Sequence, residues 1–155
     1  MPSILIVCTA NICRSPLAMA ILEARLAEDA ETSDWKVESA GTWALEGERA
    51  ARFSQAAASQ RGLDLSNHLS RNVNREMMKS FDLILTMERG QKEALTAEFP
   101  ESADQIFMVS ELVGGMYDIY DPIGGPYSDY ENTAAELERI FKEGLEHLKE
   151  LVVAA

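Results

Sequence analysis

The sequence predicts an α/β fold built on a four-stranded parallel sheet that is flanked by helices on both faces. Two observations support this fold class. Four short segments expected to be strands, of which residues 3–7 and 82–86 are typical of buried strands, alternate with segments of helical periodicity. Strands that alternate with helices form parallel sheets. The chain has 155 residues and no repeat, low-complexity tract or linker, which favours one domain over residues 1–155.

The first half of the chain contains two of the expected strands and two of the expected helices. Residues 3–7 form an apolar run and are expected to be a buried strand. A helix is expected over residues 15–29, a second strand over 36–40, and an Ala-rich helix over 49–60 that Gly62 can end. The apolar residues at helical spacing in the first helix are Leu17, Ala18, Ile21, Leu22, Ala24 and Leu26.

The second half of the chain continues this alternation. A short helix is expected over residues 74–79, and a third buried strand over 82–86. A helix over residues 89–99 stops at Pro100, and a fourth strand follows at 106–109.

The C-terminal part is predicted to be a loop followed by one long helix. Residues 114–130 are rich in Gly, Pro, Asp and Tyr, which is typical of a loop. Residues 131–152 are expected to form an amphipathic helix. Its apolar side carries Leu137, Ile140, Phe141, Leu145 and Leu148.

Composition and charge limit the function. The longest apolar runs are far shorter than the roughly 20 residues of a membrane span, and no export signal is visible, so we expect a cytoplasmic protein without a membrane partner. The net charge of -12 repels phosphate backbones, so nucleic acid is not an expected partner. We expect a monomer. An anionic substrate would need a local positive group, and Arg14 is placed to supply one.

The two cysteines, Cys8 and Cys13, do not form a structural disulfide framework. A bridge between them would close only a small loop and would stabilise the fold little. Together with His68 they make only three candidate ligands for zinc, so no metal site is expected. A redox or catalytic role is favoured over a structural one.

The segment VCTANICRSP, residues 7–16, joins the first strand to the first helix. Such a loop collects unpaired backbone N–H groups, and the helix dipole adds positive charge, so it can bind an anion. Arg14 can hold two phosphate oxygens at once. Cys8, whose thiolate this environment stabilises, would face the bound phosphorus. Ser15 can donate a hydrogen bond to the sulfur, and Asn11 tolerates a left-handed backbone.

An attack on phosphorus also needs an acid that protonates the leaving oxygen. Asp121 is the best candidate, because its loop follows the fourth strand and can fold over the sheet edge where ligands bind. Pro122 stiffens the chain beside it. Asp118 and Asp129 are the alternatives, and Asp-Pro taken alone is also a turn signal.

Four segments together resemble the low-molecular-weight protein tyrosine phosphatase family, in the same order over nearly the whole chain. They are VCTANICRSP at 7–16, SAGT at 39–42, DLILTME at 82–88 and DPIGG at 121–125. The resemblance implies a flavodoxin-like fold, with Cys8 as nucleophile, Arg14 as phosphate clamp and Asp121 as general acid and base. It also implies a phosphocysteine intermediate, a phosphorylated protein or peptide as substrate, and no metal or organic cofactor.

The resemblance assigns supporting roles as well. The phosphate-binding loop, which would also take inorganic phosphate or other oxyanions, would comprise Thr9, Ala10, Asn11, Ile12, Cys13 and Ser15. Asn11, Ser15, Ser39 and His68 resemble the polar network that supports this loop. Cys13 resembles the second loop cysteine, which can form a reversible disulfide with Cys8.

The sequence departs from the family pattern at two places. Ala10 stands where the family usually has Gly, which requires φ < 0 or some strain there. Ile123-Gly124-Gly125 follows Asp-Pro in place of aromatic residues and resembles the branch that acts on phosphoarginine. Ile12, by contrast, resembles the tyrosine-type loop. The expected walls of the substrate pocket are Ile12, Trp43, Ile123 and Tyr127.

We therefore expect a protein tyrosine phosphatase. The alternatives are a protein arginine phosphatase on the same fold and a non-catalytic anion-binding or redox-sensing module that uses Cys8 and Cys13. An arsenate reductase would need cysteines after Cys13, and none follows. A Cys–His hydrolase with His68 as base would leave Arg14 without a role.

Overall fold

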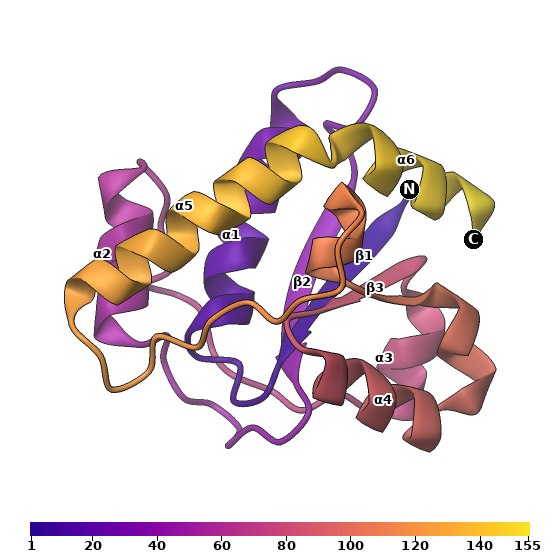
Figure 1. Ribbon diagram of the computed structural model, residues 1–155, viewed down its shortest axis with the longest axis horizontal. Helices are drawn as coiled ribbons and strands as arrows, with labels where there is room; N and C mark the ends of the chain where they lie inside the picture. Colours follow the sequence, from indigo (N-terminus) through magenta and orange to yellow (C-terminus); the bar gives the residue numbers. More distant parts are fainter.

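The computed structural model describes residues 1–155 and contains a four-stranded parallel sheet with helices on both faces (Figure 1). The strands are β1 (Ser3–Cys8), β2 (Lys36–Gly41), β3 (Leu83–Thr86) and β4 (Ile106–Met108). They are arranged in the order β2-β1-β3-β4, and every neighbouring pair is parallel. The predicted fold class is confirmed.

Six α-helices and two 3-10 helices surround the sheet. The α-helices are α1 (Arg14–Ala27), α2 (Arg52–Gln60), α3 (Arg75–Ser80), α4 (Arg89–Glu98), α5 (Tyr127–Glu143) and α6 (Leu145–Ala154). The 3-10 helices are η1 (Pro100–Gln105) and η2 (Val109–Val113). None of the helices is long and apolar enough to cross a membrane.

The side chains of β1 alternate between the two faces of the sheet, as the pleat requires. Ile4 and Ile6 belong to the larger apolar cluster, which includes residues of α1, α5 and α6. Leu5 and Val7 belong to a smaller cluster with residues of α3 and α4. Because helices cover both faces, all four side chains are fully buried, which explains the continuous apolar run in the sequence.

The strand order places a crevice at the end of β1. The chain moves from β1 to β2 on one side, whereas β3 and β4 lie on the other side. In open α/β sheets, ligands bind outside the carboxyl ends of the strands at such a change of direction. Cys8 is the last residue of β1 and therefore lies at this crevice.

The prediction of one long helix over residues 131–152 is wrong. The helix begins earlier, at Tyr127, and Gly144 separates α5 from α6. A tertiary contact requires glycine at this position, because a Cβ atom at Gly144 would lie 2.7 Å from the Cβ of Leu112 in η2. The apolar periodicity runs on through this break and conceals it.

Two smaller corrections concern other helices. The helix expected from residue 49 begins at Arg52, because Arg49 instead pairs with Leu69 in an isolated antiparallel bridge. The two 3-10 helices, which flank β4, were not expected, and both are short.

Candidate active site

The loop over residues 9–13 turns its carbonyl groups outward. These carbonyl oxygens accept hydrogen bonds from surrounding segments: Thr9 O from Trp43 N at 3.0 Å, Ile12 O from Ala51 N at 2.7 Å and Cys13 O from Ser54 Oγ at 3.2 Å. The last carbonyl of β1, Cys8 O, accepts from Thr42 N at 2.9 Å. No backbone N–H of residues 9–13 donates to a protein acceptor. The first turn of α1, which follows, contains no acidic residue to oppose its dipole. The loop is therefore a cationic nest suited to an oxyanion.

Asn11 holds the shape of this loop from inside. Its φ of 59° is the left-handed conformation that asparagine tolerates, and it is the one non-glycine residue with positive φ. Its Nδ2 donates to Ser15 Oγ at 2.8 Å and to Ser39 Oγ at 3.0 Å, while its Oδ1 accepts from Arg71 N at 3.0 Å. Ala10 keeps a negative φ, so its methyl group needs no left-handed strain.

Cys8 is buried, with a sulfur atom 3.0 Å from the Ser15 hydroxyl oxygen. This oxygen already accepts a hydrogen from Asn11, so the Ser15 hydroxyl proton can point toward the sulfur or toward the Ala40 carbonyl oxygen at 3.5 Å. The arrangement suits a thiolate, since a hydroxyl donor faces the atom that carries the negative charge.

Arg14 joins three segments of the chain and is itself 2% exposed. Its Nη1 donates to Glu88 Oε2 at 2.5 Å and to the Ile119 carbonyl oxygen at 2.9 Å. Its Nη2 lies 3.4 Å from Oδ2 of Asp121, whose Oδ1 accepts from the Ile123 N–H at 3.1 Å. The structure thus brings Cys8, Arg14 and Asp121 to one edge of the sheet, although more than a hundred residues separate Asp121 from the loop.

The second loop cysteine, Cys13, is a buried thiol. Burial raises its pKa to about 11, although a contact of 3.9 Å with the Tyr130 hydroxyl partly opposes this effect. Burial and the neighbouring Cys13 likewise raise the pKa of Tyr130 to about 12. Both cysteines are free. At neutral pH Cys13 therefore carries its proton.

His68 supports the loop from outside. Its Nε2 lies 2.8 Å from the Asn11 carbonyl oxygen. Burial lowers its pKa, as does the positive charge of Arg71, although the bond to Asn11 opposes them. A neutral ring that donates its Nε2 hydrogen to Asn11 fits these surroundings.

The four expected pocket walls differ in their exposure. Trp43 is 85% exposed and Ile123 is 54% exposed, and Ile12 is half-buried within the loop. The ring of Tyr127 instead packs edge-to-face on Phe53, with the ring centres 5.8 Å apart, and its hydroxyl group is buried. Trp43 and Ile123 are therefore the most exposed of the four side chains.

The two alternative acids lie elsewhere. Asp118 Oδ1 accepts a hydrogen bond from the Arg89 N–H at 2.8 Å, at the start of α4. Asp129 lies in the first turn of α5. Neither carboxylate contacts Arg14, so Asp121 is the candidate acid that the geometry favours.

Sequence reasoning missed two side chains that hold the site. Glu88 pairs with Arg14, and Gln91 Nε2 donates to Thr9 Oγ1 at 3.0 Å. The one available signal was the position of Glu88 just after the third strand, inside the segment 82–88. The side chains of Glu88 and Gln91 reach the loop because β3, which precedes them, pairs directly with β1 in the sheet.

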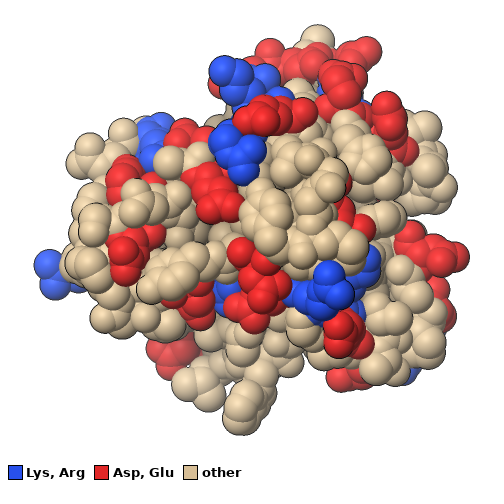
Figure 2. All heavy atoms as spheres, in the orientation of Figure 1, with Lys and Arg blue, Asp and Glu red and all other residues tan.

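Charge around the site is mixed. Figure 2 shows acidic side chains spread over the visible face with basic ones among them. No group of three or more His, Cys, Asp or Glu side chains is placed to hold a metal ion. Because the chain carries a net charge of -12, an anion at this site would have to be held by the N–H groups and Arg14 against the overall field.

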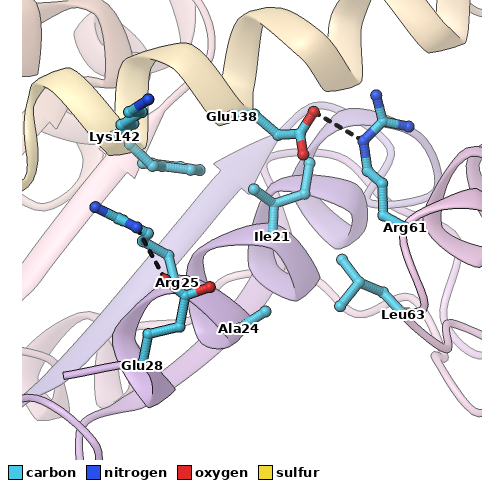
Figure 3. Close-up of a pocket in the computed structure, with 9 residues that line it drawn as sticks. Ile21, Ala24, Arg25, Glu28, Arg61, Leu63, Glu138 and Lys142 are labelled. Carbon is cyan, nitrogen blue, oxygen red and sulfur yellow. Dashed lines mark hydrogen bonds and ion pairs between the residues drawn. The ribbon is translucent and has the colours of Figure 1, made fainter. Parts of the chain in front are cut away.

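A separate hollow of about 270 Å³ lies along the C-terminal half of α1 (Figure 3). Its floor is apolar, with Ile21, Ala24 and Leu63 between the flanking charges. Arg61 reaches Glu138 across its rim at 2.9 Å. None of the candidate site residues lines it.

The fold and the site define a class: α/β proteins with a cysteine and an arginine in an anion-binding loop between the first strand and the first helix. The model of the family described as low molecular weight phosphotyrosine protein phosphatase matches residues 3–154. The chain belongs to this family and is therefore a protein phosphatase, a hydrolase whose family acts on phosphorylated proteins.

Relatives include both kinds of phosphatase. A protein-arginine-phosphatase of Geobacillus stearothermophilus is 35% identical over 94% of this chain and 95% of its own. The low molecular weight protein-tyrosine-phosphatase Wzb of Escherichia coli K12 is 35% identical over 86% of this chain and 83% of its own. A structure of the arginine phosphatase YwlE, a Cys-to-Ser mutant with a phosphorylated active-site serine, is 32% identical, covers 95% of both chains and gives a TM-score of 0.88.

Proposed function

We propose that this protein hydrolyses phosphotyrosine in proteins through a phosphocysteine on Cys8, and that residues 1–155 form this one catalytic domain. The convergence of the Cys8 sulfur, the Arg14 guanidinium and the Asp121 carboxylate on one loop carries the proposal. A nucleophile, an anion clamp and a proton donor are the three groups that phosphoryl transfer to a cysteine requires.

In the first step, the phosphoryl oxygens bind the N–H groups of residues 9–13 and Arg14. The bound phosphate competes with Asp121 for the guanidinium. The Cys8 thiolate attacks phosphorus, so that an S–P bond forms while the bond from phosphorus to the tyrosyl oxygen breaks. Asp121 gives its proton to that oxygen, and neutral tyrosine leaves.

In the second step, the ionised Asp121 takes a proton from a water molecule. The water oxygen attacks phosphorus, the S–P bond breaks, and inorganic phosphate leaves with the thiolate restored. The Ser15 hydroxyl supports this step, because it lies 3.0 Å from the departing sulfur.

Two features support phosphotyrosine as the substrate. Ile12 is a half-buried apolar residue of the loop, and the backbone of Trp43, whose ring is exposed, is bonded to the same loop through Trp43 N and Thr9 O at 3.0 Å. An aromatic ring could stack between such side chains.

Phosphoarginine is the second candidate substrate. Ile123-Gly124-Gly125 places no aromatic residue after Asp121, and the arginine phosphatases match more of this chain than Wzb does. Asp121 would protonate the leaving nitrogen of arginine in the same position. The chemistry at Cys8 is the same for both substrates.

The test is phosphate release in EDTA from two peptides of one sequence, one with phosphotyrosine and one with phosphoarginine. We expect the wild type to favour phosphotyrosine and Cys8→Ser to release none from either peptide. Preference for the phosphoarginine peptide would select the second candidate. Turnover by Cys8→Ser, or no turnover of either peptide by the wild type, would refute the proposed chemistry.

A further inference from the structure

The segment that leads to Asp121 is attached to the start of α4 at two consecutive residues. Asp118 Oδ1 accepts a hydrogen bond from the N–H of Arg89, the first residue of α4, at 2.8 Å. Next to it, the Ile119 N–H donates to the Met87 carbonyl oxygen at 2.9 Å. The first N–H groups of a helix lack partners within the helix and favour an anionic acceptor, so the carboxylate of Asp118 suits this position.

The same turn also holds the phosphate loop. Gln91, which is 5% exposed, accepts hydrogen bonds through its Oε1 from the Met87 and Glu88 N–H groups, each at 3.0 Å. With its oxygen fixed in this way, its amide nitrogen points outward and donates to Thr9 Oγ1 at 3.0 Å. One rigid turn therefore contacts both the loop of the nucleophile and the loop of the acid.

The chain that follows Asp121 is held by a local turn. The Gly125 N–H donates to the Pro122 carbonyl oxygen at 2.9 Å, Gly124 has a positive φ of 78°, and Ile123 is more than half exposed. On the side that precedes Asp121, the Thr133 hydroxyl of α5 reaches the Tyr120 carbonyl oxygen at 3.4 Å, which is long for a hydrogen bond. The shorter bonds that tie this backbone to other segments are those of Asp118 and Ile119 with the start of α4 and that of Arg14 Nη1 with the Ile119 carbonyl oxygen at 2.9 Å.

We propose that Asp118 is a positioning residue for the proton transfer, because it fixes the Asp121 loop on the N-terminal turn of α4. The same turn is bonded to the phosphate loop through Gln91 and Thr9, and it thereby sets the distance between the Asp121 loop and Cys8. The inference rests on the proposed role of Asp121 as general acid. Asp118 acts through the backbone, because its carboxylate bonds to Arg89 N and does not contact Arg14. An acid displaced by about 1 Å loses on the order of 100-fold in rate.

The dependence of the rate on the leaving group distinguishes a positioning role of Asp118 from simple stabilisation of the fold. An aryl phosphate with a poorly acidic phenol needs the proton from Asp121, whereas one with a strongly acidic phenol departs without it. The experiment compares kcat/KM, which reports the first phosphoryl transfer, for phenyl phosphate and p-nitrophenyl phosphate. The proteins are the wild type, Asp118→Ala, Asp118→Asn and Asp121→Ala.

Asp82→Ala is the matched control. Asp82 Oδ2 accepts a hydrogen bond from the Ser3 N–H at 2.9 Å, so it also joins distant segments through a backbone N–H, but at the opposite end of β1. Its loss should lower the free energy of unfolding without changing the ratio of the two substrates. Asp118 is exposed, so its substitution should leave the fold intact.

We expect Asp118→Ala to lower kcat/KM about 10-fold for phenyl phosphate and far less for p-nitrophenyl phosphate, in the same direction as Asp121→Ala. Asp118→Asn should stay near the wild type, because its amide oxygen can still accept from Arg89. The positioning role is overturned if Asp121→Ala slows phenyl phosphate more than p-nitrophenyl phosphate and Asp118→Ala does not. It is also overturned if Asp118→Asn lowers kcat/KM as much as Asp118→Ala. If Asp121→Ala itself slows both substrates equally, the acid role in the proposed function fails instead.

Discussion

The sulfur of Cys8 lies 3.0 Å from the hydroxyl oxygen of Ser15, and that hydroxyl is oriented by the amide of Asn11 at 2.8 Å. A polar relay inside a buried loop therefore ends on the atom proposed to attack phosphorus. In the proposed mechanism this hydroxyl faces the sulfur both before the attack and after the S–P bond breaks.

Removal of this donor should slow both chemical steps. Hydrogen bonds to charged groups contribute about 1.5–3 kcal/mol, so Ser15→Ala should lower kcat about 10- to 100-fold. Alkylation of Cys8 by iodoacetamide at neutral pH should slow as well. Ser102→Ala, which removes a buried hydroxyl in η1, is the control. Equal activity of Ser15→Ala and wild type would exclude the relay.

The two loop cysteines should differ sharply in reactivity. Because burial raises the pKa of Cys13 to about 11, it carries almost no thiolate at neutral pH. Iodoacetamide should therefore label Cys8 and spare Cys13, and inorganic phosphate should protect Cys8. Mass-spectrometric fragmentation of the labelled N-terminal peptide measures the two sites separately. Labelling of Cys13 at the rate of Cys8 would contradict the structure.

His68 should make the fold sensitive to mild acid. Burial and the charge of Arg71 lower the pKa of His68 in the folded state. Below the ordinary histidine pKa of about 6.5, the unfolded chain therefore binds the proton more readily than the folded chain does. This contribution to stability is present above that pH and is lost as the pH falls through the folded pKa. The slope for one proton is at most about 1.4 kcal/mol per pH unit.

Urea unfolding at pH 7, 6 and 5 measures this effect. His68→Gln should flatten the loss of stability over this range. The control is His147→Gln, because His147 lies on the exposed side of α6, and it should keep the wild-type slope. If both variants follow the wild type, His68 does not control the acid sensitivity.

A methyl group at Gly41 should damage the phosphate loop. Its Cβ would lie 2.4 Å from the Thr9 carbonyl oxygen, and backbone must move to relieve such a contact. We expect Gly41→Ala to cost about 1–3 kcal/mol of unfolding free energy and to weaken phosphate binding. Gly90→Ala meets nothing within 4 Å in α4 and should stabilise the protein by about 0.4–1 kcal/mol. A higher thermal unfolding midpoint for Gly41→Ala than for Gly90→Ala would refute the predicted clash.

Much of the fold follows from local patterns. The four strands begin and end within a residue or so of the predicted ranges. The pattern is clearest for β1 and β3, whose apolar runs are buried by helices on both faces. The break at Gly144 depends on Leu112, which is distant in the sequence and makes no local pattern. The start of α2 depends in the same way on the pairing of Arg49 with Leu69.

The site likewise contains a part that local sequence predicts and a part that depends on the tertiary fold. The loop from Cys8 to Ser15 is contiguous, so its chemistry can be recognised from residue types and spacing, and Asn11 is a residue type that tolerates the left-handed backbone. The contacts of Glu88, Gln91 and Asp118 require the strand order β2-β1-β3-β4, which no local signal determines. The packing of the Tyr127 ring on Phe53 of α2 likewise joins segments that are distant in the sequence.

The most direct test of the central claim is detection of the phosphoryl group on the enzyme during turnover. Wild type mixed with excess phosphotyrosine peptide would be quenched rapidly in denaturant, and the N-terminal peptide analysed by mass spectrometry. The account predicts a phosphoryl group on Cys8 that forms within one turnover and disappears when substrate is exhausted. Continued phosphate release with no phosphoryl group on Cys8 at any time, or with one on another residue, would contradict it.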